Sequence, residues 1–460
     1  MSAQRSPVIR AETESWIAAG SVALLGSGVF LVFTSLFTSN LLIAGVGAGA
    51  ASLALFVLFA SGWVAMLPMA ALSLALPPAY ASEAIRLGPA LLVTVLVVVA
   101  WGISKGVSAR PIRTGRLPIW AIALFLGWLI ISAGFAADRG SAARETANLL
   151  LFFAFLIAAT DLLVSRPERV RALVVILGWT AAAVGAFAVL ETLAFVPGAF
   201  ALGGTGYYRA TGGFAWPNEL AMYLTISLPF TVFLLREAES PLRRSLAVLA
   251  LLLAVAGLVA TFSRGSWIAT LVAPAALLSL GERRLAFRVW LLAILAGLSL
   301  DLASGGAVSG RITQTLVDPL VGQRFLLTRA GVLMFMAHPL VGMGPGGFET
   351  GLDEFGLLVP GLTNFVASAH NTYVHVAAEL GSVGFLALTG FLASTWWTLR
   401  SSARRFSSQA STRSRLTSTL FWSFTAACAI SFAEWTLAQG IGQLIMLVAA
   451  MGFAADAEAS

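Results

Sequence analysis

Fourteen apolar segments dominate this chain of 460 residues and decide what it can fold into. About 20 apolar residues are enough to cross a bilayer as a helix. Only 11% of the residues are charged, against about 25% in soluble domains. We therefore predict an all-α polytopic membrane protein with about 12–14 transmembrane helices, forming a single membrane domain over residues 1–460. The predicted spans are 16–37, 41–61, 63–79, 88–104, 119–135, 148–164, 172–192, 220–235, 246–262, 266–280, 289–303, 372–398, 417–433 and 437–454.

Basic residues predict the orientation of these spans. Inside loops of membrane proteins carry an excess of Lys and Arg. If the N-terminus is inside, 20 of the 28 basic residues fall in inside segments and eight fall outside. Both ends are therefore predicted inside, and the longest polar segment, 305–371, is predicted to be a large outer loop.

The outer loop 305–371 holds a predicted helix and two histidines. Residues 323–337 have helical periodicity, with an apolar face that we expect at the membrane surface, and Pro339 ends the helix. Arg324 and Arg329 are five residues apart, about 140° around an ideal helix, so only one of them is expected to reach a given ligand. His338 stands before Pro339, and His370 opens the next long helix.

Two shorter outer turns also carry arginines, against the general bias. Arg209 lies in a Gly-rich loop, and Arg264 lies in a short turn between two apolar runs. A charge so close to hydrocarbon usually faces a polar cavity. The alternatives are an ordinary surface loop for Arg209 and a side chain extended to the interface for Arg264.

Outer arginines with one histidine suit a polyanionic ligand. Guanidinium groups bind phosphate oxygens in pairs and stabilise a departing diphosphate, and histidine can accept a proton from an attacking hydroxyl. The histidines lack the spacing of a zinc site and no P-loop is present. The single cysteine, Cys428, excludes a disulfide framework. Scattered basic residues argue against nucleic-acid binding. We expect no metal, no cofactor and no nucleotide.

Four motifs in order resemble the bacterial O-antigen ligase/polymerase superfamily, over about residues 205–390. They are Arg209–Phe214 with Pro217–Ala221, then Thr261–Gly265, then Arg324 followed by His338–Phe348, and finally His370-Asn371 with Glu379–Gly384. The family position four residues after the loop arginine is often aromatic, and here it is Thr328.

The resemblance implies a glycosyltransferase-C-like enzyme of the bacterial inner membrane with a periplasmic active site. It would move a glycan from undecaprenyl diphosphate to a saccharide hydroxyl without metal. The resemblance assigns the donor diphosphate to Arg209, Arg264 and Arg324 and the catalytic role to His370. Supporting roles would fall to Asn218, Arg329, His338 and Asn371.

The sequence leaves the acceptor open. An O-antigen ligase uses lipid A-core, whereas a polymerase uses another lipid-linked repeat of an O-antigen or exopolysaccharide; we favour the ligase. A lipid-linked glycan transporter or flippase would be expected to show internal repeats with broken helices in both halves. No such repeats are visible.

Overall fold

The computed structural model describes most of the chain after residue 93. The described residues are 94–95, 97–99, 101–107, 111–193, 200–201, 208–214, 216–303, 305–313, 319–363, 368–409, 411–437 and 440–457. The chain forms two compact units, residues 1–111 and 112–460. The first three predicted spans and part of the fourth lie outside the described residues. The total of 12–14 spans and the single membrane domain therefore stay predictions.

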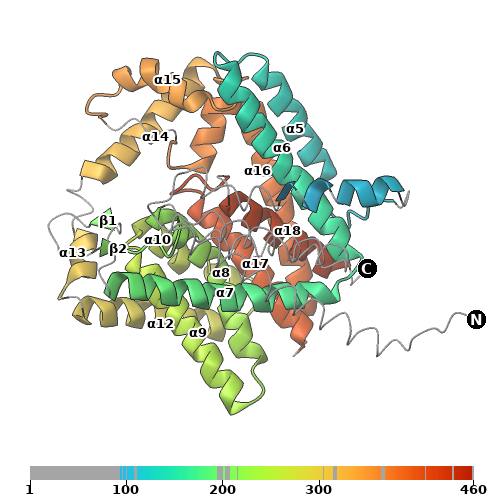
Figure 1. Ribbon diagram of the computed structural model, residues 1–460, viewed down its shortest axis with the longest axis vertical. Coiled ribbons are helices and arrows are strands. Elements are labelled where there is room, and N and C mark those ends of the chain that lie inside the picture. Colours follow the sequence, from blue (N-terminus) through green and yellow to red (C-terminus); the bar gives the residue numbers. More distant parts are fainter. Residues whose placement is uncertain are drawn as a thin grey trace, which may run out of the picture. The chain divides into compact units, whose positions relative to one another are not determined.

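The fold is all-α, as predicted (Figure 1). In the second unit the only regular strands among the described residues are β1 (Phe200–Ala201) and β2 (Tyr208–Arg209), which pair antiparallel. The helices before the long loop are α5 (Ile119–Ala133), α6 (Arg139–Val164), α7 (Glu168–Leu193), α8 (Pro217–Glu237), α9 (Pro241–Ala260), α10 (Arg264–Val272), α11 (Ala275–Leu278) and α12 (Arg283–Ala303). Those within and after it are α13 (Ala307–Thr313), α14 (Pro319–Ala337), α15 (Gly347–Phe355), the 3₁₀ turn η3 (Gly356–Leu358), α16 (Thr372–Phe406), α17 (Thr412–Ile430) and α18 (Ile441–Ala457).

Five of the described helices are long and apolar enough to cross a membrane: α6, α7, α8, α9 and α16. The chain is therefore a polytopic membrane protein. Apart from 266–280, each predicted span between residues 119 and 454 overlaps one observed helix; several helices begin earlier than predicted at their polar ends, and α17 and α18 are shifted against the predicted bounds. Capping explains several of these ends. The side chain of Asp138 accepts hydrogen bonds at the start of α6, and that of Ser240 does so at the start of α9.

The predicted span 266–280 is wrong as a single helix. The structure has α10 and α11 in its place, with a turn at Ala273–Pro274 between them. Proline lacks the amide hydrogen that a continuous helix needs at this position and clashes with the preceding turn. The break leaves α10 as a short helix whose first residue is Arg264.

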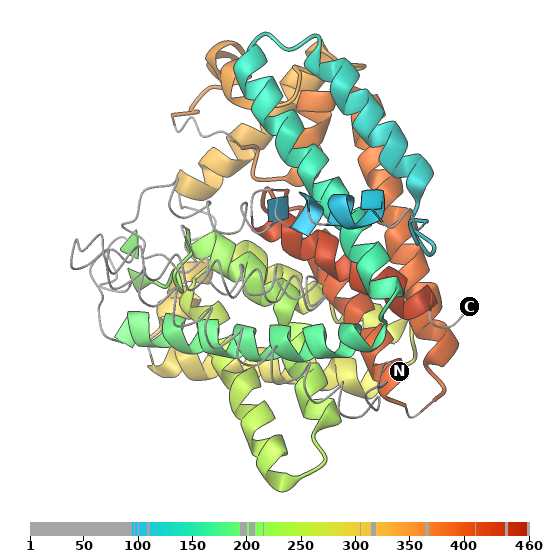
Figure 2. The ribbon, with the colours of Figure 1, turned by 45° about the vertical axis from the view of Figure 1, so that its right-hand side comes forward.

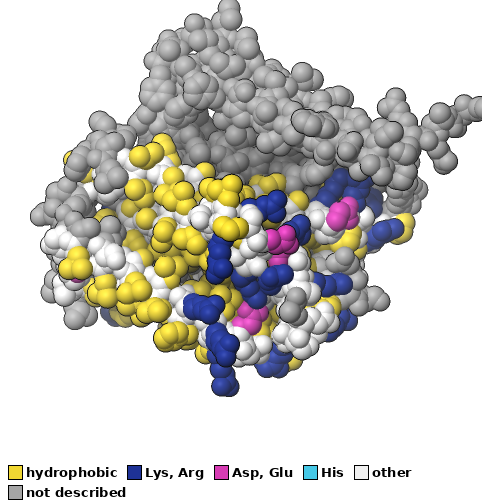
Figure 3. Space-filling model, turned by 90° about the horizontal axis from the view of Figure 1, so that it is seen from below, with side chains coloured by type: hydrophobic (Ala, Val, Ile, Leu, Met, Phe, Trp, Pro, Cys, Tyr) yellow, Lys and Arg dark blue, Asp and Glu magenta, His cyan; other side chains and the backbone are white. Residues whose placement is uncertain are grey.

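Helices distant in sequence pack side by side in this unit. α7 packs against α8 and α9, α17 against α8, and α18 against α6 (Figures 1 and 2). Near the α8–α9 end, ion pairs join Arg171 and Arg415 to Glu237, and Arg236 to Glu282. Figure 3 views the molecule from below and shows basic side chains beside a hydrophobic surface. The arginines in these ion pairs belong to the segments predicted to face inside.

α16 is interrupted at Gly381, and the glycine-rich turn after α14 fills the break. Gly381 has φ +64°, and a Cβ there would lie 2.2 Å from the carbonyl oxygen of Leu340. Glycine is therefore required at this position. Backbone amides of the turn donate to carbonyl groups that the break exposes, from Met343 N to Ala378 O (2.9 Å) and from Gly344 N to Glu379 O (2.8 Å). The indole Nε1 of Trp128 donates to Leu380 O (2.8 Å), and the amide of Ser382, which the break also frees, donates to Pro339 O of the turn (2.8 Å).

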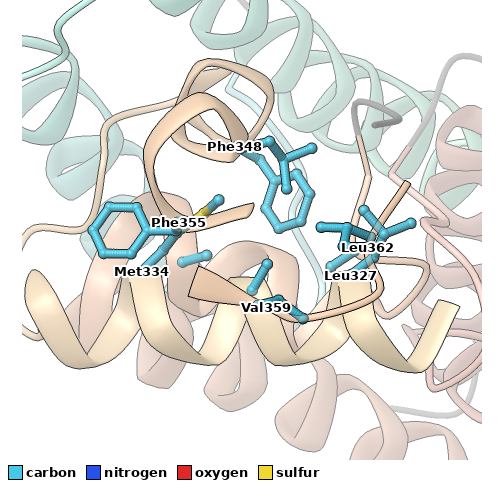
Figure 4. Packing of buried hydrophobic residues seen from close by; sticks show 10 residues of the cluster. Leu327, Met334, Phe348, Phe355, Val359 and Leu362 are labelled. Carbon is cyan, nitrogen blue, oxygen red and sulfur yellow. The ribbon is translucent and has the colours of Figure 1, made fainter. Parts of the chain in front are cut away.

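The outer loop has a hydrophobic core of its own (Figure 4). Leu327 and Met334 of α14 pack against Phe348 and Phe355 of α15, while Val359 and Leu362 close the cluster. The predicted helix 323–337 is present but begins at Pro319 and ends at Ala337. Apolar residues occupy its other faces too, and Phe325, Val332 and Met336 are exposed. The loop is therefore a packed helical unit, as predicted, and its membrane contact and periplasmic side stay predictions.

Candidate functional site

Glu434 joins two of the residues that the sequence singles out. Its Oε1 is 2.9 Å from Nη1 of Arg324, and its Oε2 is 3.1 Å from Nδ1 of His370. These residues come from three places in the chain: α14, the segment before α16 and the turn between α17 and α18. The structure therefore brings Arg324 and His370 together through a carboxylate.

The burial of this group is uneven. The side chain of Glu434 is only 4% exposed, whereas those of Arg324 and His370 are 34% and 25% exposed. Burial raises the pKa of the Glu434 carboxyl, but the hydrogen bond from His370 and the charges of Arg324 and His370 outweigh it and hold the pKa below its ordinary value. Glu434 is therefore ionised at neutral pH and orients two side chains that a ligand can reach.

Hydrogen bonds fix the turn that carries Glu434. The hydroxyl of Thr372, at the start of α16, donates to the carbonyl oxygen of Glu434 (2.8 Å) and accepts from the amide of Thr436 (2.9 Å). The amide of Thr372 donates to the carbonyl oxygen of Ser431 (2.8 Å). The beginning of α16 and the α17–α18 turn thus form one rigid support.

α14 is tied to the same support. The hydroxyl of Thr328 donates to the carbonyl oxygen of Ala369 (3.0 Å), directly before His370. His370 itself has φ +49°, a left-handed conformation that few residues other than glycine adopt. Its amide donates to the hydroxyl of Ser368 (3.1 Å). These contacts set the distance between the helix bearing Arg324 and the imidazole.

Arg209 belongs to a second polar group at the ends of α8 and α9. Its Nε donates to the carbonyl oxygen of Thr261 (2.8 Å), and its Nη2 donates to Oδ1 of Asn218 (2.7 Å). Asn218 therefore contacts Arg209, and its supporting role in donor binding stays a prediction. The loop is anchored from α7, where the buried carboxylate of Glu191 accepts from both the amide and hydroxyl groups of Thr211 and from the amide of Gly212, each at 2.8 Å.

Arg264 begins α10 and is half-buried. The residue after it, Gly265, packs so closely on the α17–α18 turn that a Cβ would lie 2.7 Å from Cβ of Ala433. Ala433 precedes Glu434. Arg264 therefore precedes Gly265, which contacts the turn that supports the Arg324–Glu434–His370 group. It also lies three residues after Thr261, whose carbonyl oxygen accepts a hydrogen bond from Arg209.

Each of the two polar groups, the one around Arg209 and the one around Glu434, contains a residue with a strained backbone conformation. Among the described residues other than glycine, only Phe262 and His370 have positive φ, +50° and +49°. Phe262 lies between Thr261 and Arg264. Strained conformations of this kind gather at functional sites, where the surrounding structure maintains them. That all three arginines and His370 line one diphosphate pocket stays a prediction.

The remaining predicted residues lie elsewhere or have other contacts. Arg329 is exposed on α14 and takes no part in the Glu434 ion pairs. His338 is exposed, with its ring edge-on to Phe355. The side chain of Asn371 caps α16 by accepting from the amides of Tyr373 and Val374. Within the described part of the chain, no group of three or more His, Cys, Asp or Glu could hold a metal ion.

Sequence reasoning missed Glu434 and Glu191. Each of them stands alone in the sequence, with no second carboxylate nearby to suggest a site. A usable signal was present for Glu434, because it directly follows the predicted span 417–433 on the outer side. An ionisable residue at the end of an apolar span is energetically costly, and Arg264 was singled out for the same reason. Glu191 lies inside a predicted span, where an ionisable residue is itself a sign of function.

This arrangement can bind an anion and transfer a proton. With Glu434 ionised, Nδ1 of His370 donates to it, which leaves Nε2 as the nitrogen that can accept a proton. The carboxylate then stabilises the imidazolium that forms, as in catalytic triads. The guanidinium of Arg324, beside the imidazole, can bind phosphate oxygens.

A comparison with known protein families finds one match. Residues 249–389 match the family described as O-antigen ligase. The matched range contains Arg264, Arg324 and His370 but ends before Glu434. No curated protein matches the chain.

Proposed function

Because this chain belongs to the O-antigen ligase/polymerase superfamily, we propose that it is a membrane glycosyltransferase that uses undecaprenyl-diphosphate-linked glycan as donor. The acceptor is a saccharide hydroxyl of lipid A-core, which makes the enzyme an O-antigen ligase. The reaction takes place at the periplasmic face of the inner membrane and needs no metal. The N- and C-termini are cytoplasmic.

One observation carries this proposal: Glu434 holds Arg324 and His370 at 2.9 and 3.1 Å on one partly exposed surface. A group that binds phosphate and a group that accepts a proton therefore lie side by side. Transfer of a glycan from a lipid diphosphate needs both. A scaffold protein, or a transporter that moves lipid-linked glycan intact, would need no proton acceptor beside a phosphate-binding group.

The arginines act on the donor. Arg209, Arg264 and Arg324 bind the diphosphate and neutralise the charge that grows on it when its bond to the anomeric carbon breaks. A groove of about 770 Å³ lies between α8, α9, α10 and α12. It is lined mostly by apolar side chains and includes Trp267, three residues after Arg264. Such a groove suits the polyprenyl chain of the donor.

His370 acts on the acceptor. Its Nε2 takes the proton of the acceptor hydroxyl while the oxygen attacks the anomeric carbon of the donor sugar. A new glycosidic bond forms, the bond to the diphosphate breaks, and undecaprenyl diphosphate leaves with the electron pair. Glu434 keeps the imidazole oriented and stabilises its charged form.

A polymerase would use the same groups with a lipid-linked repeat as acceptor. The two functions are separated by offering purified protein a lipid-linked glycan either alone or with rough lipopolysaccharide. We expect capped lipid A-core in the second mixture and no ladder in the first. Ladder growth without lipopolysaccharide would identify a polymerase, and no transfer in either mixture would contradict the proposed function.

A further inference from the structure

A polar cavity of about 180 Å³ adjoins the α17–α18 turn. It is lined by side chains of α6, α15 and α16 and by Trp435, the residue after Glu434. The N-terminal end of α6 lies beside α15 and α16 in both ribbon views (Figures 1 and 2). Most ligand sites that enclose a drug-sized molecule measure roughly 300–1,000 Å³. This cavity therefore suits one small group.

Charged side chains with both donor and acceptor capacity line the cavity. Glu145 of α6, Glu349 of α15 and Glu379 of α16 supply carboxylates, and Arg144 of α6 supplies a guanidinium. Glu145 is hydrogen-bonded to Asn148, but its Oε1 is buried with no hydrogen-bond partner among the described residues. The three carboxylates thus give the cavity hydrogen-bond acceptors, and Arg144 gives it donors.

The wall on the α16 side is held rigidly. Oε1 of Glu379 accepts from the amide of Phe348 (3.0 Å) and lies 3.3 Å from Nε2 of His375. The His375 ring packs between Phe348 and Trp435, with centroid distances of 4.9 and 4.1 Å. These residues therefore give the cavity a fixed shape and an aromatic edge.

The side chains that line the cavity favour one class of ligand over the others. Among the described residues, no three His, Cys, Asp or Glu side chains are placed so that they could hold one metal ion. Three carboxylates disfavour a phosphate group by repulsion. Sugar hydroxyls fit best, because each can donate to a carboxylate and accept from a guanidinium, while the apolar face of a sugar ring can pack on an aromatic side chain.

We propose that this cavity is a saccharide subsite, which binds one sugar residue of a substrate through Glu145, Glu349 and Arg144 with Trp435 at its edge. The proposal rests on the proposed transferase function. Because Trp435 and Glu434 are adjacent, a sugar bound here lies next to the support of His370. The acceptor saccharide is therefore the expected occupant, and the first sugars of the donor are the other source of the same chemistry.

The test uses the Glu145→Gln and Glu349→Gln variants of the full chain in nanodiscs. Each keeps the size of the side chain but removes the charged acceptor. Transfer rates are measured while acceptor and donor are varied separately. We expect the apparent KM for the acceptor to rise at least about tenfold, a loss of the size that one hydrogen bond to a charged group supplies, while kcat at saturation stays within about twofold. The control is Glu354→Gln, which removes an exposed carboxylate of the same helix α15 that does not line the cavity.

A second readout does not depend on catalysis. Binding of the lipid-free core oligosaccharide to each variant is measured by saturation-transfer NMR. Weaker binding in both cavity variants but not in Glu354→Gln supports the subsite. A raised KM for the donor instead of the acceptor would assign the cavity to the donor glycan. Unchanged binding and KM values in folded Glu145→Gln and Glu349→Gln would overturn the subsite. A wild-type protein that binds oligosaccharide but transfers nothing would overturn the proposed function alone.

Discussion

Glu434 determines how the two residues that carry the proposed chemistry face each other. It lies in a short turn, it is almost fully buried, and each of its oxygens contacts a different partner. A buried carboxylate is stable only when it is paired. The group Arg324–Glu434–His370 therefore behaves as a unit, and the loss of one member should disturb the other two.

Arg324 and Arg329 offer a matched pair of variants. Both are arginines of α14, but only Arg324 contacts Glu434, whereas Arg329 is exposed. Arg324→Ala should lower kcat by roughly 10²–10³-fold, as expected when a group that stabilises transition-state charge is removed. Arg329→Ala should keep at least about half of the wild-type rate. Equal losses in the two variants, measured by glycan transfer in vitro, would contradict the assignment of Arg324.

Stability should depend on pH through Glu434. Its pKa is lowered in the folded protein, so its ionised form stabilises the fold above its ordinary value of 4.5, and this contribution is lost as the pH falls through the lowered value. Glu434→Gln should therefore unfold at a lower temperature than wild type at about pH 7. The gap should shrink below about pH 4. A gap of constant size, measured by thermal unfolding in detergent, would be inconsistent with this ion pair.

The chemistry of a residue could be predicted only where a local pattern pointed to it. Arg209, Arg264 and Arg324 stood out as arginines in outer segments, and the family resemblance singled out His370. The pairing of Arg324 and His370 with Glu434 could not be predicted, because it joins residues up to 110 positions apart in sequence through a three-dimensional contact. The sequence also did not reveal that Asn371 caps α16, because Asn occurs both at helix caps and in polar binding sites.

At the scale of elements, the break in α16 holds the outer loop in place. The glycine-rich turn enters the break, and backbone amides of the turn satisfy the exposed carbonyl groups. α14 and α15 pack on the same region through the core around Phe348. The position of Arg324 relative to His370 thus depends on a glycine 57 residues later in the chain.

Gly381→Ala should unfold the outer loop or prevent its docking. A Cβ at Gly381 would lie 2.2 Å from a backbone oxygen, and its φ of +64° disfavours alanine. The combined cost should exceed about 3 kcal/mol. Gly127→Ala is the control, because a Cβ there meets no atom within 4 Å and alanine favours a helix by about 1 kcal/mol. The yield of monodisperse protein after size-exclusion chromatography distinguishes them, and equal yields would refute the close contact.

Helix positions were largely predictable, because about 20 apolar residues in a row have few alternatives in a membrane. The breaks in helices were not. The span 266–280 contained Pro274, which predicted a weak point but not two helices. Gly381 lies in a long helical segment, and its sequence neighbours give no sign that another turn inserts there. Such breaks depend on partners elsewhere in the fold, which a local pattern does not contain.

The chain is a membrane protein, and the groups proposed to form its site lie at helix ends and in the loop 305–371. The groups proposed to act on the donor come from α10, α14 and the loop before α8, and those proposed to act on the acceptor come from the start of α16. A site assembled from so many elements requires the complete fold. It should be lost when the fold is lost and should not depend on an added ion.

Activity should survive removal of metal ions. In the proposed mechanism, arginine charge takes the place of a metal ion in neutralising the diphosphate. Purified protein treated with a chelator should transfer glycan at more than about half of the untreated rate. Complete loss of transfer, restored only by an added divalent ion, would overturn the metal-free mechanism.

The most direct test of the central claim is glycan transfer by Arg264→Ala and His370→Ala in reconstituted membranes, with wild type beside them. The claim is that arginines of outer turns bind the donor diphosphate while His370 accepts the proton of the acceptor. Both variants should insert and purify like wild type, yet transfer less than about a hundredth as much glycan from the lipid-linked donor. Wild-type transfer by both variants would contradict the account.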